Sequence, residues 1–136
     1  MARGEGDGIR GARRAGTYAL TVLAGAGMLL LGGPFAGSAQ AAALCPGHQV
    51  RSLSFGTGKT VVYRNRDYVC AVTLAKSAGP RRGMSVGVQA RGSLAVVDRG
   101  DYTHHAGPVT VHAGHRCVRV TGHVGGKSTR TGWILC

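Results

Sequence analysis

Histidines are the first side chains in this sequence that could do chemistry, because imidazoles bind Zn²⁺ or Cu²⁺ and titrate near neutral pH. Five of the six gather in one part of the chain: His104, His105, His112, His115 and His123. On a strand, however, His112 and His115 would point to opposite faces. No Asp or Glu follows Asp101 to orient a ligating imidazole. We therefore expect scattered surface histidines without a metal or cofactor; the alternative is a weak adventitious Zn or Cu site.

A second candidate is Gly-Thr-Gly-Lys-Thr at residues 56–60, which looks like the end of a phosphate-binding loop. Such a loop needs another Gly five positions before Gly58, where this chain has Leu53. It must also open into a helix that faces the phosphate. The residues that follow, Val61, Val62 and Tyr63, favour a strand. We predict a turn that leads into a strand, and no nucleotide site.

The residue types in this sequence give little support for a hydrolytic enzyme. Only three carboxylates follow residue 41, namely Asp67, Asp98 and Asp101, and there is no Gly-x-Ser-x-Gly motif. We expect Asp98 and Asp101 to flank a turn, "DRGDY", in which Asp bonds the backbone. The Arg-Gly-Asp within it is interpreted as a chance match to the integrin tripeptide. We predict that the protein is not an enzyme and has no catalytic residues.

Residues 1–41 have the parts of an export signal. A basic segment with Arg3, Arg10, Arg13 and Arg14 precedes an apolar run at residues 18–31, and small residues follow at Ala39 and Ala41. Cleavage between Ala41 and Ala42 satisfies the Ala-x-Ala rule, as does cleavage after Ala43. A membrane anchor is the alternative, but Gly32, Gly33 and Pro34 interrupt the apolar run. A lipid anchor on Cys45 is disfavoured because Leu44, which is not small, precedes it.

We thus predict a cleaved signal at 1–41, a single secreted β domain at 42–136, and no stable membrane insertion after cleavage. All four cysteines follow the signal: Cys45, Cys70, Cys117 and Cys136. In a small exported chain an even number of cysteines indicates disulfides, here two. Three pairings are possible; we favour Cys45–Cys70 with Cys117–Cys136, which would staple the two ends of the domain separately.

The chain is strongly basic, with a formal net charge of +12, of which about +10 belongs to residues 42–136. Such a surface attracts polyanions, and anionic cell-wall or spore-surface polymers are the partners we expect. Sequence-specific nucleic-acid binding would need stacking aromatics between basic residues. Tyr63 and Tyr68 beside Arg64 and Arg66 are the one candidate, and we interpret the two tyrosines as cross-strand packing. The oligomeric state does not follow from the sequence.

Short apolar runs separated by turn residues, with no helical period, indicate an all-β fold: a small antiparallel β-sandwich or barrel. We expect strands at 59–64, 68–74, 84–90, 93–98, 108–113, 116–124 and 130–136, with turns at 65–67 and 125–128 and a loop at 76–83. No helix is expected after residue 41. The core candidates are Val62, Cys70, Val72, Leu74, Val86, Val88, Leu94, Val96, Val109, Val111, Cys117, Val118, Val120, Trp133 and Leu135.

One segment carries a family resemblance. It contains the series Asp98, Gly100, Tyr102, Ala106, Gly107, Pro108 and Val109 and runs on to Cys117. With Cys45-Pro-Gly-His-Gln-Val, the strand and second Cys of residues 58–74, and the closing Cys136, it resembles the spore-associated protein A family of small exported Streptomyces proteins. The resemblance implies a protein on or near spores and aerial growth, with no catalytic residues to carry over. This chain is more basic than that family and has His105 where Tyr is commoner.

Two other secreted families have similar size or cysteine number. Subtilisin-inhibitor proteins would need an exposed inhibitory loop, for which 76–83 is the candidate. Enediyne-binding apoproteins use closely spaced Cys pairs, which this chain lacks. We expect an exported, non-enzymatic surface or spore-associated protein; the alternative is a secreted protease-inhibitor-like or polyanion-binding, antimicrobial module.

Overall fold

The computed structural model describes residues 36–136. The basic and apolar parts of the predicted signal lie outside the described residues. One helix and eight strands follow one another: α1 (Ala36–Leu44), β1 (His48–Phe55), β2 (Gly58–Asn65), β3 (Tyr68–Ala75), β4 (Arg82–Ala90), β5 (Val96–Tyr102), β6 (His105–His112), β7 (Val118–Val124) and β8 (Lys127–Arg130).

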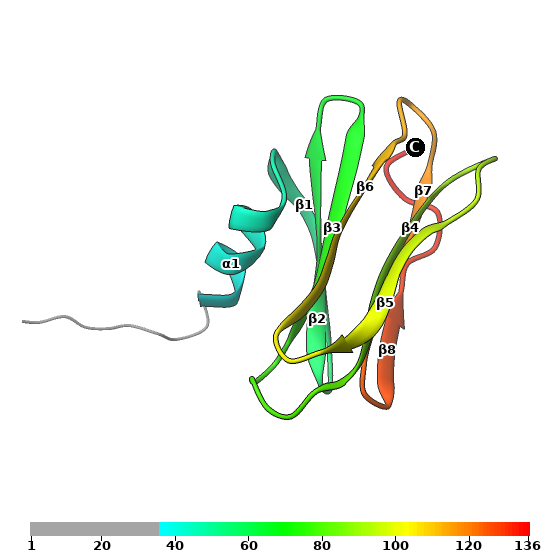
Figure 1. The fold of residues 1–136 in the computed structure, drawn as a ribbon. Helices are drawn as coiled ribbons and strands as arrows, with labels where there is room; N and C mark the ends of the chain where they lie inside the picture. The colour runs from blue at the N-terminus through cyan, green and yellow to red at the C-terminus, as the bar shows by residue number, and fades with distance from the viewer. Residues whose placement is uncertain (1–35) are drawn as a thin grey trace, which may run out of the picture. The chain divides into compact units, whose positions relative to one another are not determined.

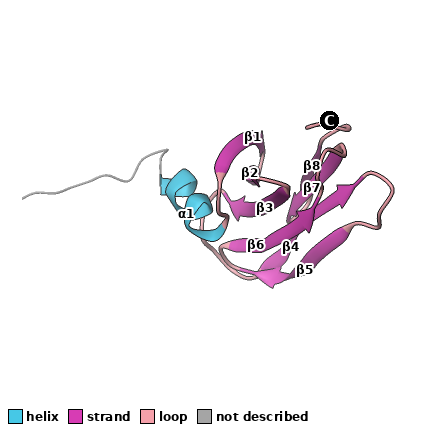
Figure 2. Cartoon of the chain, turned by 90° about the horizontal axis from the view of Figure 1, so that it is seen from above, coloured by secondary structure: helices cyan, strands magenta, loops and turns pink. Residues whose placement is uncertain are grey.

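The strands form two four-stranded antiparallel sheets that face each other (Figures 1 and 2). The first has the order β1-β2-β3-β6 and the second β5-β4-β7-β8. The expected all-β sandwich is confirmed. Gly56 and Thr57 form the turn between β1 and β2, and Gly58 begins β2. The Gly-Thr-Gly-Lys-Thr stretch therefore leads into a strand.

Alternation of apolar and small polar residues explains why the sheets pack on each other. In β4, Met84, Val86 and Val88 are fully buried, and in β7 Val118 and Val120 are fully buried. Side chains at every second position share one face of a strand, so both strands present an apolar face inward. The core between the sheets consists of Val62, Val69, Ala71, Met84, Val86, Val88, Ala90, Ala106, Val109, Ala113, Val118, Val120 and Val124.

The central strands of the first sheet, β2 and β3, are buried on both faces. A second apolar cluster on its outer face contains Val61, Tyr63, Val72 and Leu74, together with Ala41 and the Cys45–Cys70 disulfide. The helix α1 lies over this face in both views (Figures 1 and 2). It extends through Ala42–Leu44, where no helix was expected, because the apolar sheet face gives its Ala-rich sequence a surface on which to pack.

The favoured disulfide pairing is confirmed. Cys45 bonds Cys70 at a sequence separation of 25, and Cys117 bonds Cys136 at a separation of 19. The first bridge fixes the end of α1 to β3. The second fixes the C-terminal segment beside the start of β7. Cys117 lies just before Val118, the first residue of β7, so it is not constrained by the alternation of that strand.

Several local expectations were wrong. The strand β1 was missed because only Val50, Leu53 and Phe55 in it are apolar, and a register shift after Gln49 breaks their spacing. Residues 98–101 form part of β5 and not a turn. The strand β8 begins at Lys127, inside the expected turn, and the chain after Arg130 makes only an isolated bridge, Val118–Ile134.

Two core candidates are on the surface. The side chain of Leu94 is 89% exposed and that of Val96 is 48% exposed. Leu94 lies in the connection between β4 and β5, which projects beyond the two sheets (Figures 1 and 2). Val72, Cys70 and Leu74 are buried as expected, but beneath α1 and not between the sheets.

Candidate functional site

The outer face of the second sheet carries polar and cationic side chains, because the residues that alternate with the core valines point away from it. In one row across the sheet, Ser85 of β4 lies between Arg99 of β5 and His123 of β7. Ser128 of β8 lies beyond His123. In the next row, Thr121 of β7 pairs with Arg130 of β8.

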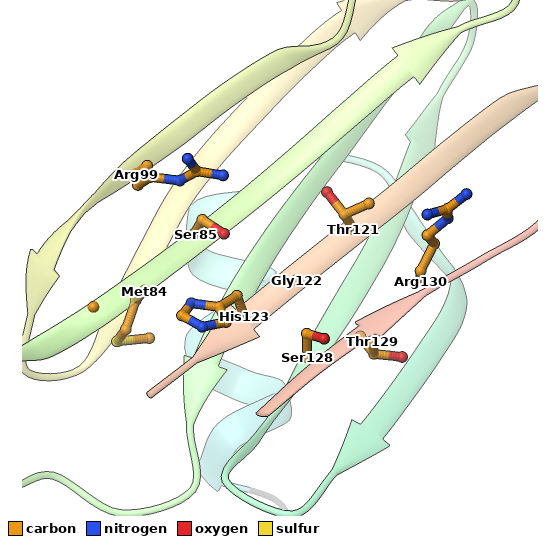
Figure 3. Close-up of a pocket in the computed structure, with 10 residues that line it drawn as sticks. Met84, Ser85, Arg99, Thr121, Gly122, His123, Ser128, Thr129 and Arg130 are labelled. Carbon is orange, nitrogen blue, oxygen red and sulfur yellow. The ribbon is translucent and has the colours of Figure 1, made fainter. Parts of the chain in front are cut away.

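A shallow groove of about 600 Å³ follows this face (Figure 3). Its floor is shallow along β4 because Gly83 and Gly87, on either side of the outward-facing Ser85, have no side chains. A Cβ on Gly87 would lie 2.7 Å from Thr121 Oγ1, so a larger residue there would have to displace the Thr121 side chain. We call this site the cationic groove and define it by Ser85, Arg99, Thr121, His123, Ser128 and Arg130.

The two arginines stand at opposite margins of the cationic groove. Arg99 is on β5 and Arg130 on β8, and both are exposed. Three inter-strand steps separate their strands, which places their backbones about 14 Å apart. Among residues 36–136, neither guanidinium has a hydrogen-bond or ion-pair partner. An anion bound there would therefore not have to displace a protein contact.

Two other arginines in the described part of the chain are bonded to backbone carbonyls. Arg64 Nη2 donates to the Gly114 carbonyl at 2.7 Å. Arg82 Nη2 donates to the Ser77 carbonyl at 2.6 Å. These side chains hold loops, because backbone carbonyls satisfy their N–H groups. The arginines of the cationic groove have no such role.

Trp133 lies at the end of this face between two more cations. The guanidinium carbon of Arg119 is 4.3 Å from the ring centroid and that of Arg91 is 5.2 Å away. The face of an indole attracts cations. Because the two arginines approach this ring, it is not a free platform on which a nucleic-acid base could stack. The absence of sequence-specific nucleic-acid binding stays a prediction.

Of the three side-chain carboxylates in residues 36–136, Asp101 alone lies on the same face as the cationic groove, opposite Gly83. Asp98 accepts hydrogen bonds from the Tyr102 hydroxyl at 2.6 Å and from the Gly107 N–H at 2.7 Å. The hydrogen bond from the Tyr102 hydroxyl to Asp98, together with desolvation, raises the pKa of Tyr102. Asp67 lies 3.9 Å from His112, far along the chain from the groove. Asp101, on β5, is the one exposed carboxylate on the strand that carries Arg99.

The histidines are not gathered. Within residues 36–136, no group of three or more His, Cys, Asp and Glu side chains is placed to hold a metal ion. Tyr68 meets His112 edge-on at 5.1 Å, while Tyr63 is buried in the cluster under α1. The pairing places Tyr63 opposite Cys70 and Tyr68 opposite Asn65, so the two tyrosines are diagonal neighbours on β2 and β3 and not a directly opposed pair.

The cationic groove was not predicted from the sequence. The alternation of Ser85, Gly87 and Gln89 in β4 was visible as a polar face. Nothing in the sequence, however, showed that β5 and β7 flank β4 or that β8 exists. The scattered arginines became a site only when the strand order brought Arg99 and Arg130 to one face.

The described residues thus define a disulfide-bonded, two-sheet β protein with a cationic outer face. No family model, curated protein or solved structure matches the chain. Two disulfides are compatible with an extracellular protein. Between residues 36 and 136 there is no helix long and apolar enough to cross a bilayer.

Proposed function

We propose that this is an exported, non-enzymatic protein of the cell or spore surface that binds anionic wall polymers through the cationic groove. The observation that carries the proposal is the pair Arg99 and Arg130, which are exposed and without partners at the two margins of one groove. Guanidinium groups bind phosphate and carboxylate well because their N–H groups match the geometry of both anions.

The floor of the groove supports the same function. Ser85, Thr121 and Ser128 have hydroxyl groups that both donate and accept hydrogen bonds. A polymer that combines anionic groups with hydroxyl groups would find partners for both. The open, shallow form of the groove suits an extended chain, which can lie across a sheet without entering a deep cavity.

The test is binding of purified teichoic acid, a polyol-phosphate wall polymer, to the protein and to Arg99→Gln/Arg130→Gln. Exposed ion pairs are individually weak, so we expect the loss of two cations to lower affinity roughly tenfold at about 50 mM salt. Wild-type affinity should fall steeply as salt rises, because added ions screen exposed charges. In sporulating cells, a salt wash should release the protein from the surface.

The matched control is Arg51→Gln/Lys76→Gln, which removes the same charge from exposed positions outside the groove. If this control loses as much affinity as the groove variant, the binding depends on net charge alone and the groove is not the site. If wild-type protein does not bind the polymer at low salt, the proposed function is wrong.

A further inference from the structure

One surface feature is a run of apolar residues that the rest of residues 36–136 leaves uncovered. Leu94, Ala95, Val96 and Val97 are all exposed, with Leu94 at 89%, Val96 at 48% and Val97 at 50%. Four consecutive exposed apolar residues are rare in a folded protein unless they have a function. We call residues 94–97 the apolar tip.

The apolar tip stands clear of the sandwich. Val96 and Val97 are neighbours in β5 and point to opposite faces, yet both are about half exposed. Each valine at the start of β5 therefore leaves about half of its side chain unpacked. Figures 1 and 2 both show the connection between β4 and β5 extending beyond the two sheets.

The connection that presents the apolar tip is braced by hydrogen bonds. Arg116 Nη1 donates to Ser93 Oγ at 2.8 Å. Gln89 Nε2 donates to the Ser93 carbonyl at 3.0 Å. The N–H of Arg91 donates to the Cys117 carbonyl at 2.9 Å. These bonds fix the turn that holds Leu94 in an exposed position. Binding of a partner therefore loses little conformational entropy of the backbone at this turn.

Two cations lie beside the base of the apolar tip. Arg91 and Arg116 are exposed; Arg116 bonds Ser93, and the guanidinium carbon of Arg91 lies 5.2 Å from the Trp133 ring centroid. The hydrogen bonds of Arg116 go to carbonyl groups and a hydroxyl, so its charge is not neutralised. Asp98, the nearest carboxylate in the chain, is bonded to Tyr102 and Gly107.

We infer that the apolar tip binds the surface of a bilayer that contains anionic lipids. Leu94 and the two valines would enter the headgroup region, while Arg91 and Arg116 would remain at the level of the lipid phosphates. Apolar burial combined with attraction of basic residues to anionic lipid is how proteins bind membrane interfaces without crossing them. Lipid binding by the apolar tip does not depend on polymer binding by the cationic groove, so either proposal can be disproved without the other.

A second copy of the chain fits the apolar tip less well. Two tips that met would bring Arg91 and Arg116 of both copies together, and like charges at an interface repel. An anionic bilayer provides both an apolar layer for Leu94 and negative charge for the arginines. The charge around the tip therefore favours lipid over self-association.

The experiment is flotation of the purified protein with vesicles of phosphatidylglycerol and phosphatidylcholine, and with vesicles of phosphatidylcholine alone. The variants Leu94→Ser and Arg91→Gln are compared with wild type. We expect Leu94→Ser to weaken binding to the anionic vesicles about tenfold, since a buried Leu side chain contributes that much or more. Arg91→Gln should weaken it about fivefold. Leu94 makes almost no contact with the protein, so its substitution should leave the fold intact.

A spectroscopic readout tests entry into lipid directly. The chain has one tryptophan, Trp133, so the difference between Leu94→Trp and wild type reports the tip alone. The fluorescence emission of the tryptophan introduced at position 94 should shift to the blue with anionic vesicles and not with vesicles of phosphatidylcholine alone. Equal binding of Leu94→Ser and wild type, or an unshifted Leu94→Trp, would overturn the inference. So would a dimer without vesicles that Leu94→Ser abolishes, because the partner would then be a second copy.

Discussion

The Tyr102 hydroxyl donates a 2.6 Å hydrogen bond to the Asp98 carboxylate four residues earlier on the same strand. The ring reaches back across Gly100, where a Cβ would lie 2.9 Å from the ring and from its oxygen. The other Asp98 oxygen accepts from the Gly107 N–H, next to the cis peptide bond between Gly107 and Pro108. One carboxylate thus ties β5 to β6, which are the neighbouring edges of the two sheets.

We predict that this tie weakens in alkaline solution. The hydrogen bond to Asp98 raises the pKa of Tyr102 above its ordinary value of 10.0. A raised pKa means that the stabilisation is complete below the unfolded pKa and is lost as pH rises through the folded pKa. Urea unfolding at about pH 8 and about pH 11 should show a smaller fall in stability for Tyr102→Phe than for wild type. The control is Tyr68→Phe, at an exposed tyrosine, which should leave that fall unchanged. An equal fall in wild type and Tyr102→Phe would contradict the prediction.

Asp98→Ala should destabilise the protein more than most surface substitutions. It leaves the Tyr102 hydroxyl and the Gly107 N–H without their acceptor. An unsatisfied donor that is partly buried costs about 1–3 kcal/mol. Chemical denaturation at neutral pH measures the difference, and Asp101→Ala, at an exposed position of the same strand, is the matched control. Similar unfolding midpoints for the two variants would show that the tie contributes nothing.

Gly122→Ala should also be strongly destabilising. A Cβ on Gly122 would overlap Thr60 Oγ1 and approach Thr73 Oγ1 to 2.8 Å. These two hydroxyls share a buried 2.8 Å hydrogen bond in the centre of the first sheet. Overpacking of this kind costs about 1–3 kcal/mol. Gly126→Ala, where a Cβ would meet open space, should change the melting temperature little; a comparable loss in both variants would rule out the proposed overlap as the cause.

Much of this fold could be predicted because its signals are local. Alternation in β4 and β7 and the turn residues around β2 and β3 identify strands without knowledge of their partners. Local signals failed for Leu94 and Val96, which were predicted to be in the core only because their side chains are apolar. Whether a strand end projects beyond its sheet depends on the neighbouring strands, and the sequence contains no such information.

The candidate site depends even more on non-local structure. Arg99 and Arg130 are 31 positions apart in the chain, and they share a face only because β4 and β7 lie between their strands. Asp98 was expected in a turn for a related reason. Gly100 makes "DRGDY" look like a turn, whereas it is the residue that leaves room for the Tyr102 ring on a strand.

The two disulfides should contribute comparable stability. Each closes a loop of similar length, at separations of 25 and 19 residues, and the chain-entropy treatment gives about 3 kcal/mol for each. Cys45→Ser/Cys70→Ser and Cys117→Ser/Cys136→Ser should therefore lower the free energy of unfolding by similar amounts. Guanidinium denaturation of the two double variants measures both. A much larger loss for the first pair would contradict this and show that loop closure alone does not explain the contribution of its bridge.

Removal of the leader should precede folding. We predict cleavage between Ala41 and Ala42, yet Ala41 is fully buried and its carbonyl accepts a 3.0 Å hydrogen bond from the Cys45 N–H. A protease reaches such a bond only after local unfolding, which the Cys45–Cys70 disulfide opposes. Signal peptidase should therefore cut the reduced, unfolded precursor faster than the oxidised, folded one. Intact mass measurement of the culture medium should show a chain that begins at Ala42 and is four hydrogens lighter than its reduced form. Free thiols, or a full-length chain in the membrane fraction, would contradict export.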